Sequence, residues 1–259
     1  MKHPLALALA VALGTGLVAC SQTDASPQSA DAQAADSQGD AAVANNPFFT
    51  ESPLPLHFPR FDQIKDSHFG PAFDRGMADH LKEVEAITSN PEEPTFDNTI
   101  IALEKSGDVL SRTASVFFSL VGADTNDARK AIQAEYAPKL SAHSDAISLN
   151  PELFARIQKL YDSRDSLGLD PEGVRLIERY HTDFVRAGAK LSDADKTRLK
   201  EINGELATLG TTFSQNVLAE VNDSAIVVDD VAMLKGLSEQ AITAATEAAK
   251  SRGLDGKYV

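Results

Sequence analysis

Residues 95–122 read TFDNTIIALEKSGDVLSRTASVFFSLVG, and their apolar positions recur every three or four residues. That spacing puts them on one face of a helix. The stripe consists of Ile100, Leu103, Gly107, Leu110, Ala114, Phe117 and Val121. Thr95 or Asp97 can cap the start of such a helix, and Gly122 can close its end. We therefore predict one long amphipathic helix over residues 95–122.

Residues 192–221 predict a second long helix. Ser192 is a suitable N-cap, and Asp193 and Asp195 favour the positive end of the helix dipole. Its apolar stripe has the same spacing and consists of Leu199, Ile202, Leu206, Leu209 and Phe213. Both segments exceed the usual length of helices in globular proteins. They are therefore predicted to be antiparallel members of a helical bundle.

Shorter helical patterns fill most of the remaining chain. They cover about residues 69–88, 126–148, 151–166, 171–187 and 238–252. One segment, AIVVDD at 225–230, has the composition of a strand. The predicted fold class is mostly α, with at most a short late β segment.

Prolines alternate with phenylalanines between residues 47 and 61. This composition predicts an extended arm whose aromatic rings pack against the surface of a domain. The folded region then runs over residues 47–259, and its roughly 210 residues are enough for one domain with a core of its own.

The first 19 residues have the layout of a secretory signal peptide. Lys2 and His3 precede the apolar run LALALAVALGTGLVA, which is shorter than the roughly 20 residues that a membrane-spanning helix needs. The chain's single cysteine, Cys20, follows Leu-Val-Ala. That order resembles the bacterial lipobox, in which the cysteine is acylated and becomes the new N-terminus. Because two or more acyl chains anchor a protein stably, Cys20 is predicted to be a lipidation site that holds the chain on a membrane.

Two other interpretations of Cys20 remain. It could be a chance cysteine at the end of an ordinary signal peptide. A catalytic or zinc-binding role is disfavoured, because no histidine is near and the residue lies between a cleaved segment and a polar tail.

Residues 20–46 are predicted to be a disordered linker after the lipidated cysteine. From residue 21 onward the linker is rich in Ala, Ser, Gln and Asp and has no aromatic or basic residue, so it cannot bury enough apolar surface to fold. Ser21 after the cysteine resembles the sorting signal for the outer membrane. The predicted location is the periplasm, on a bacterial membrane, with the outer membrane favoured.

The formal net charge of −14 argues against a nucleic-acid partner on electrostatic grounds. A solvated acidic surface that aids solubility accounts for this charge, and an acidic binding face is the alternative.

No motif for catalysis is present. The chain has no H-E-x-x-H, G-x-S-x-G, Walker loop or C-x-x-C. The histidines lie on separate segments, and each alone is more typical of a surface or capping residue than of a metal ligand: His57, His68, His80, His143 and His181. Glu178 and His181 have the spacing of half a di-iron site, but no second copy exists, and an accidental pair explains them equally well. We predict no catalytic residue and no metal ligand.

Five longer segments of the sequence resemble those of a known protein family. They are FDQIKDSHFGPAFDRGM at 61–77, NPEEPTFDNTIIALEKSG at 90–107, LSAHSDAISLNPELFARI at 140–157, IERYHTDFVRAGAKLS at 177–192 and LGTTFSQNVLAEVND at 209–223. In order and spacing they resemble the dipeptidyl carboxypeptidase and oligopeptidase A branch of the thimet-oligopeptidase-like zinc metallopeptidases. The resemblance extends over residues 46–259.

The resemblance implies a two-lobed helical fold around a narrow channel, of which this chain is the N-terminal half and forms a wall. It also implies cleavage of short peptides, with release of C-terminal dipeptides. In the family, two histidines of H-E-x-x-H and a later glutamate bind zinc, and the motif's own glutamate acts as general base. This chain ends at GLDGKYV, before that region. We therefore expect an incomplete peptidase domain that binds no zinc, is inactive alone, and partners with a missing C-terminal catalytic half.

The alternative is a non-catalytic helical lipoprotein that binds peptides or protein partners. It predicts saturable peptide binding by a stable body without zinc. The peptidase interpretation predicts chelator-sensitive activity in the full-length product.

Overall fold

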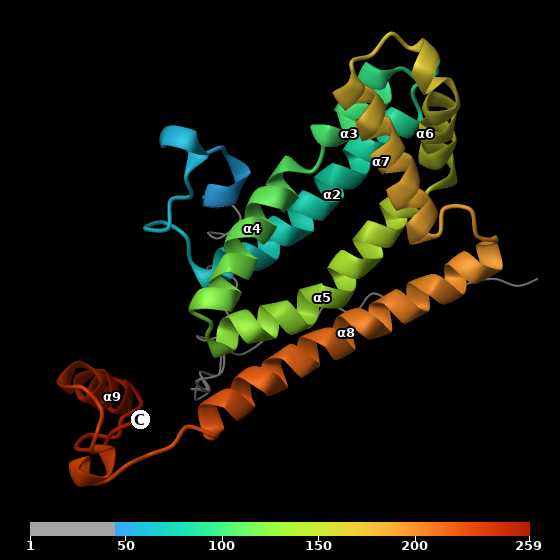
Figure 1. Cartoon of the computed structure of the whole chain (residues 1–259). Coiled ribbons are helices and arrows are strands. Elements are labelled where there is room, and N and C mark those ends of the chain that lie inside the picture. Colours follow the sequence, from blue (N-terminus) through green and yellow to red (C-terminus); the bar gives the residue numbers. More distant parts are fainter. Residues whose placement is uncertain (1–44) are drawn as a thin grey trace, which may run out of the picture. The chain divides into compact units, whose positions relative to one another are not determined.

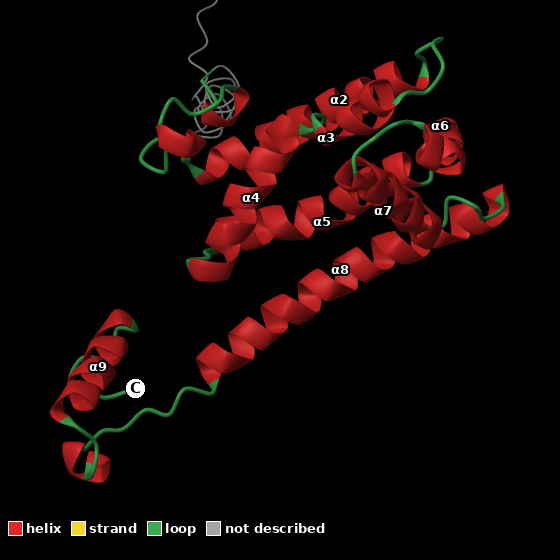
Figure 2. Ribbon diagram, turned by 45° about the horizontal axis from the view of Figure 1, so that its top comes forward, coloured by secondary structure: helices red, strands yellow, loops and turns green. Residues whose placement is uncertain are grey.

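The computed structural model describes residues 45–259 (Figure 1). The predicted signal peptide, the lipidation site Cys20 and almost all of the predicted linker lie outside the described residues. Within the described residues the chain is helical and contains no strand, which confirms the predicted mostly-α class (Figure 2).

Most predicted helices are present. They are α2 (Phe69–Thr88), α5 (Asp127–Ser148), α6 (Pro151–Ser163), α7 (Pro171–Ala187), α8 (Asp193–Asp223) and α9 (Glu239–Ser251). Five of them begin at a side chain that accepts a backbone N–H of the first turn, which satisfies a donor that the helix leaves unpaired. These caps are Asn126, Asn150, Asp170, Ser192 and Ser238.

The prediction of one continuous helix over 95–122 is wrong. Phe96–Ile101 forms a π-helical turn that leads into the short α3 (Ala102–Glu104), and α4 (Asp108–Ala123) begins only after a break. At the break Gly107 has a left-handed backbone with φ of 76°. Glycine adopts this conformation without steric cost, so the residue that continued the apolar stripe ends the first helix instead.

The break is stabilised by contacts with α2. The Glu83 carboxylate accepts the Gly107 N–H at 2.7 Å, and Nε2 of His80 lies 3.1 Å from the Ser106 hydroxyl. Within the break itself, the Ser106 hydroxyl donates to the Leu103 carbonyl at 2.7 Å. A second glycine, Gly76, brings α2 close to the start of α4. A Cβ at this position would lie 2.8 Å from the backbone of Leu110. The two glycines therefore allow α2 and α4 to pack closely.

Two hydrophobic clusters form the core, and α2 contributes to both. The first joins α2, the π-helical turn, α3, α6 and α7, and comprises Val84, Ile87, Ile100, Leu103, Leu153, Ile157, Leu160, Ile177, Phe184 and Ala189. The second is largely aromatic and joins α2, α4, α5 and the N-terminal arm. It comprises Phe48, Phe69, Ala72, Phe73, Val116, Phe117 and Tyr136.

The N-terminal arm is attached mainly through its first ring. The arm contains 3₁₀ turns at Pro47–Phe49 and Pro55–His57. Phe48 is buried, and its ring centroid lies 5.3 Å from that of Phe69. The later rings, Phe58 and Phe61, remain exposed. The prediction of an arm held by its rings is therefore correct for Phe48 and wrong for these two.

Helix α8 packs along α5 (Figure 1). Polar side chains form hydrogen bonds across this contact. The Asn203 amide donates to Asp145 at 2.8 Å, and the Gln215 amide donates to the Lys130 carbonyl at 3.0 Å. Most of the apolar stripe points away from this contact, since Leu206, Leu209 and Phe213 are 60%, 56% and 70% exposed. The stripe does not mark the face that α8 packs against its neighbour, contrary to the bundle prediction.

The predicted late strand is reduced to one bridge. Val228 and Tyr258 exchange both backbone hydrogen bonds, at 2.9 and 3.0 Å, and no longer ladder forms in the described part of the chain. None of the helices within residues 45–259 is both long enough and apolar enough to cross a membrane.

Replacing Gly107 with alanine tests the break before α4. The left-handed backbone costs alanine about 1–2 kcal/mol, and its Cβ would lie 2.8 Å from Nδ1 of His80. We expect Gly107→Ala to lower the free energy of unfolding, measured by urea denaturation, by at least this amount.

The matched control for that substitution is Gly122→Ala. Gly122 lies in α4, and no atom lies within 4 Å of the position that a Cβ would occupy. Alanine there should be neutral or stabilise the helix by up to about 1 kcal/mol. Equal effects of the two substitutions would contradict the role of Gly107.

Candidate functional site

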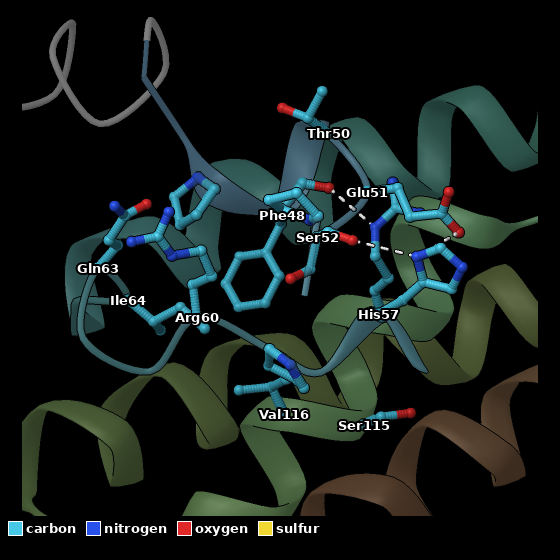
Figure 3. A pocket seen from close by; sticks show the side chains of 14 residues that line it. Phe48, Thr50, Glu51, Ser52, His57, Arg60, Gln63, Ile64, Ser115 and Val116 are labelled. Atoms are coloured by element: carbon cyan, nitrogen blue, oxygen red, sulfur yellow. Dashed lines mark hydrogen bonds and ion pairs between the residues drawn. The ribbon is translucent and has the colours of Figure 1, made fainter. Parts of the chain in front are cut away.

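A cavity of about 310 Å³ lies between the N-terminal arm and α4 (Figure 3). We call it the arm pocket. It is lined by Pro47, Phe48, Thr50, Glu51, Ser52, Pro53, His57, Pro59, Arg60, Gln63, Ile64, Arg112, Ser115 and Val116. In Figure 3, Arg60 and Gln63 approach from one side of Phe48, and Glu51 and His57 lie on the other.

The wall of the arm pocket is held in place by contacts on both sides of Phe48. The Asn46 side chain accepts the Phe48 N–H at 3.1 Å and donates to the His68 carbonyl at 2.7 Å. Nε of Arg112, on α4, donates to the Phe48 carbonyl at 3.2 Å. The arm is thereby tied to both the turn before α2 and α4, so the pocket exists before any ligand binds.

The charged side chains of the arm pocket differ in their partners. Arg60 pairs with Asp62 at 3.1 Å, and Nδ1 of His57 lies 3.5 Å from the Glu51 carboxylate. Among residues 45–259 no carboxylate lies within ion-pair distance of Arg112. Apart from the Nε contact with Phe48, its guanidinium N–H groups have no hydrogen-bond partner in the described part of the chain.

A strained turn closes one side of the arm pocket. Leu56 and His57 both have left-handed backbones, with φ of 57° and 55°. Such a conformation is unusual for residues other than glycine and costs about 1–3 kcal/mol each. It brings Nδ1 of His57 to 3.1 Å from the Ser52 carbonyl, and the Ser52 hydroxyl donates to the Phe58 carbonyl at 2.6 Å.

A second cluster joins α2, the break before α4, and α5. Nε2 of His80 lies 3.1 Å from the Ser106 hydroxyl, and Nδ1 of His80 lies 3.0 Å from Nε2 of His143. The Ser106 proton is already donated to the Leu103 carbonyl, so His80 must donate to Ser106 through Nε2. Nδ1 of neutral His80 is then an acceptor, and His143 must donate to it.

This hydrogen-bond order fixes both imidazoles in the neutral form. Nδ1 of His143 is left unprotonated and has no partner among the described residues. Burial lowers the pKa of His80, and the nearby Glu83 carboxylate opposes this shift. Burial also lowers the pKa of His143, and His80 lowers it further. A proton on either ring would place an unpaired N–H in a buried site.

The other histidines have separate structural partners. Nδ1 of His68 accepts the Lys65 N–H at 3.1 Å. The His181 ring stacks on Tyr161 with centroids 3.8 Å apart, and its Nε2 lies 3.0 Å from the Gln158 side-chain oxygen.

The residues that the structure describes do not fit a metal centre. Glu178, which has the di-iron spacing from His181, pairs with Arg164 and Arg175. Within residues 45–259 no group of three or more His, Cys, Asp or Glu side chains could hold a metal ion. The described residues therefore supply no set of zinc ligands.

Sequence patterns missed both clusters because their members are distant in the chain. His80 and His143 are 63 residues apart, and Arg112 reaches Phe48 across 64 residues. On its own segment, each histidine has no second ligand near it. The phrase SG at 106–107, a turn signal inside a helical pattern, is the one sequence feature that could have indicated the break beside His80.

Comparison with known proteins identifies relatives among peptidases. The chain is 48% identical over 214 residues to dipeptidyl carboxypeptidase of Escherichia coli, and the match covers 83% of this chain and 31% of the relative. It is 45% identical over 216 residues to dipeptidyl carboxypeptidase of Salmonella typhimurium, with 83% and 32% covered. Oligopeptidase A of Haemophilus influenzae is 30% identical over 199 residues, with 76% and 29% covered.

These similarities relate the chain to the dipeptidyl carboxypeptidases and to oligopeptidase A, and they are consistent with the N-terminal portion of the thimet-oligopeptidase-like family. Within that family its identity is higher with the dipeptidyl carboxypeptidases above than with oligopeptidase A. No family model matches the chain. The chain spans about a third of the length of the curated relatives it matches.

The neutral pair of His80 and His143 predicts a pH-dependent stability. Both pKa values lie below the ordinary 6.5 in the folded chain, so the unfolded chain binds more protons as the pH falls through 6.5. The free energy of unfolding should therefore be greatest above this pH and fall between pH 7 and pH 5. Urea denaturation at a series of pH values measures this slope.

His143→Gln isolates the contribution of the pair. Glutamine can donate to Nδ1 of His80 but does not titrate, so the slope between pH 7 and pH 5 should become smaller. Ser144→Gln, at an exposed neighbouring position on α5, should keep the original slope. An unchanged slope in His143→Gln would show that this residue is not held neutral by the fold.

Proposed function

We propose that this chain is the N-terminal portion of a peptidase that hydrolyses short peptides and releases C-terminal dipeptides. The observation that carries this proposal is the 48% identity to a dipeptidyl carboxypeptidase over 83% of the chain. A match of this length extends through the helices that build both core clusters, so the relatives should share this architecture.

The role of this portion in the proposal is to form a wall of the substrate channel. Support comes from α8, which presents apolar side chains to solvent along its length. The exposed members are Ile202, Leu206, Leu209, Phe213, Val217, Leu218 and Val221. An exposed apolar face of this kind marks an interaction surface. We propose that the remaining part of the peptidase, its C-terminal catalytic half, covers it.

The C-terminal catalytic half would carry out the hydrolysis. Zinc there would supply a Lewis acid and an activated water. The described residues of this chain contribute no ligand set. Their contribution is to shape the channel, to exclude folded proteins, and to admit short peptides.

A chimera tests the proposed function. The 214-residue matching segment of the Escherichia coli dipeptidyl carboxypeptidase is replaced by the corresponding segment of this chain. We expect the chimera to release C-terminal dipeptides from a short peptide, measured as kcat/KM by chromatography of the products. A folded but inactive chimera would contradict the proposal.

Variants of α8 in the chimera test the wall itself. Leu206→Asp or Phe213→Asp would bury an unpaired carboxylate at the covered face and should reduce kcat/KM at least about tenfold. Thr208→Asp is the matched control, since this exposed residue lies on a different side of the helix from the apolar stripe. Equal loss in all three variants would argue against a specific covered face.

We also propose that the chain is a lipoprotein, anchored through Cys20 in the periplasm with the outer membrane favoured. Support comes from the sequence alone: the Leu-Val-Ala-Cys order, the apolar run before it and the polar linker after it. Dual acylation would keep the peptidase on the membrane surface, and the linker would allow it to reach peptides in solution.

Metabolic labelling tests the anchor. Radioactive palmitate should be incorporated into the chain expressed in a Gram-negative host, and the product should fractionate with membranes. Cys20→Ser should lose the label and the membrane association, whereas Ser21→Ala should retain both. Membrane association that persists without label in Cys20→Ser would contradict the proposed lipid anchor.

A further inference from the structure

We propose that the arm pocket is a binding site for small apolar carboxylates, with Arg112 as the group that binds the anion. The ligand class is a molecule with one free carboxylate and an adjoining apolar group the size of a side chain. Binding at this site depends on the pocket's own residues and requires no peptidase activity.

The floor of the pocket supplies the apolar surface. Phe48 and Val116 are 3% and 5% exposed and belong to the aromatic core cluster, so they form a fixed wall. Ile64 and three prolines continue this surface. A cavity of about 310 Å³ with apolar walls and a few polar groups is typical of small-molecule sites.

The charges of the lining favour an anion. The pocket is lined by two guanidinium groups and one carboxylate, in a chain whose net charge is −14. The carboxylate, Glu51, lies beside His57, and Arg60 pairs with Asp62. Only Arg112 of these two arginines lacks a carboxylate partner among the described residues. A guanidinium offers paired N–H donors that match the geometry of a carboxylate.

The position of Arg112 is already set by the fold. Its Nε donates to the Phe48 carbonyl, which holds the guanidinium against the pocket wall. The same contact leaves the terminal N–H groups for a ligand. Little side-chain freedom is then lost on binding, which favours affinity for a small ligand.

The strained turn at Leu56 and His57 supports a binding role for this part of the arm. Consecutive left-handed residues other than glycine are retained where the surrounding structure holds them, often at ligand sites. Here the turn places the His57 ring on the pocket lining (Figure 3).

Two natural sources share this ligand chemistry. One is the C-terminal residue of a peptide with an apolar side chain, and the other is a short fatty acid. N-acetyl-phenylalanine represents the first and octanoate the second. N-acetyl-phenylalanine amide has the same apolar group without the charge and is the control for both.

Isothermal titration calorimetry of the 259-residue chain at pH 7.5 tests the site. We expect saturable binding of N-acetyl-phenylalanine or octanoate, and about tenfold weaker binding of the amide because it cannot pair with Arg112. The acid that binds more tightly identifies the source. Equal binding of acid and amide, or no binding of either acid, would overturn the proposal.

Substitutions locate the binding to this pocket. Arg112→Gln should weaken acid binding about tenfold and abolish the preference over the amide. Ser115→Trp fills the pocket from an exposed position on α4 while keeping Arg112, and should abolish binding. Arg175→Gln, on α7 outside the lining, should bind as the unaltered chain does.

Ser115→Trp tests the site independently if Arg112→Gln loosens the arm, because it leaves the Arg112 contact with Phe48 in place. Thermal unfolding establishes that each variant is folded. Unchanged acid binding in folded Ser115→Trp would overturn the assignment of the ligand to the arm pocket.

Discussion

The close packing of α2 against the left-handed turn at Gly107 is the constraint on which the rest of the helical body depends. It ends the helix that begins near residue 96 and starts α4 on a new path. The same contact holds His80 beside the turn, and His80 accepts a hydrogen bond from His143 of α5. Helix α5 in turn carries α8 through Asn203 and Gln215. Through this series of contacts, the turn at Gly107 influences where α8 and its exposed apolar face lie relative to the core.

Local patterns predicted the helices that have clear caps and one periodic face. Asn150 and Asp170 precede a proline at a first helical position, and both helices begin where expected. The break at Gly107 was missed because apolar spacing continues through it, and because the side chains that stabilise the turn, Glu83 and His80, belong to α2 and are distant in the sequence. The two pairs that build the candidate sites, His80 with His143 and Arg112 with Phe48, depend on tertiary packing and leave no pattern at short range.

In helix α8 the apolar periodicity predicted the helix correctly but did not identify the face that packs against α5. The stripe at Leu206, Leu209 and Phe213 does form one side of a helix, but the side that contacts α5 carries Asn203 and Gln215. Small and polar residues allow the two helices to approach while their hydrogen-bonding groups are satisfied. The chain spans about a third of the length of the curated relatives it matches. We propose that the remaining part of the peptidase covers the exposed apolar side of α8.

Thiol labelling of Phe213→Cys, with Cys20 replaced by serine, would show whether the apolar face of α8 is covered in the larger protein. The rate of reaction with a maleimide is compared between the 259-residue chain and the chimera that carries the rest of a dipeptidyl carboxypeptidase, in a background without other reactive cysteines. We expect fast labelling in the chain alone and strong protection in the chimera, with Thr208→Cys reacting rapidly in both. Equal labelling of Phe213→Cys in the two proteins would show that the apolar face of α8 is not where the peptidase parts meet.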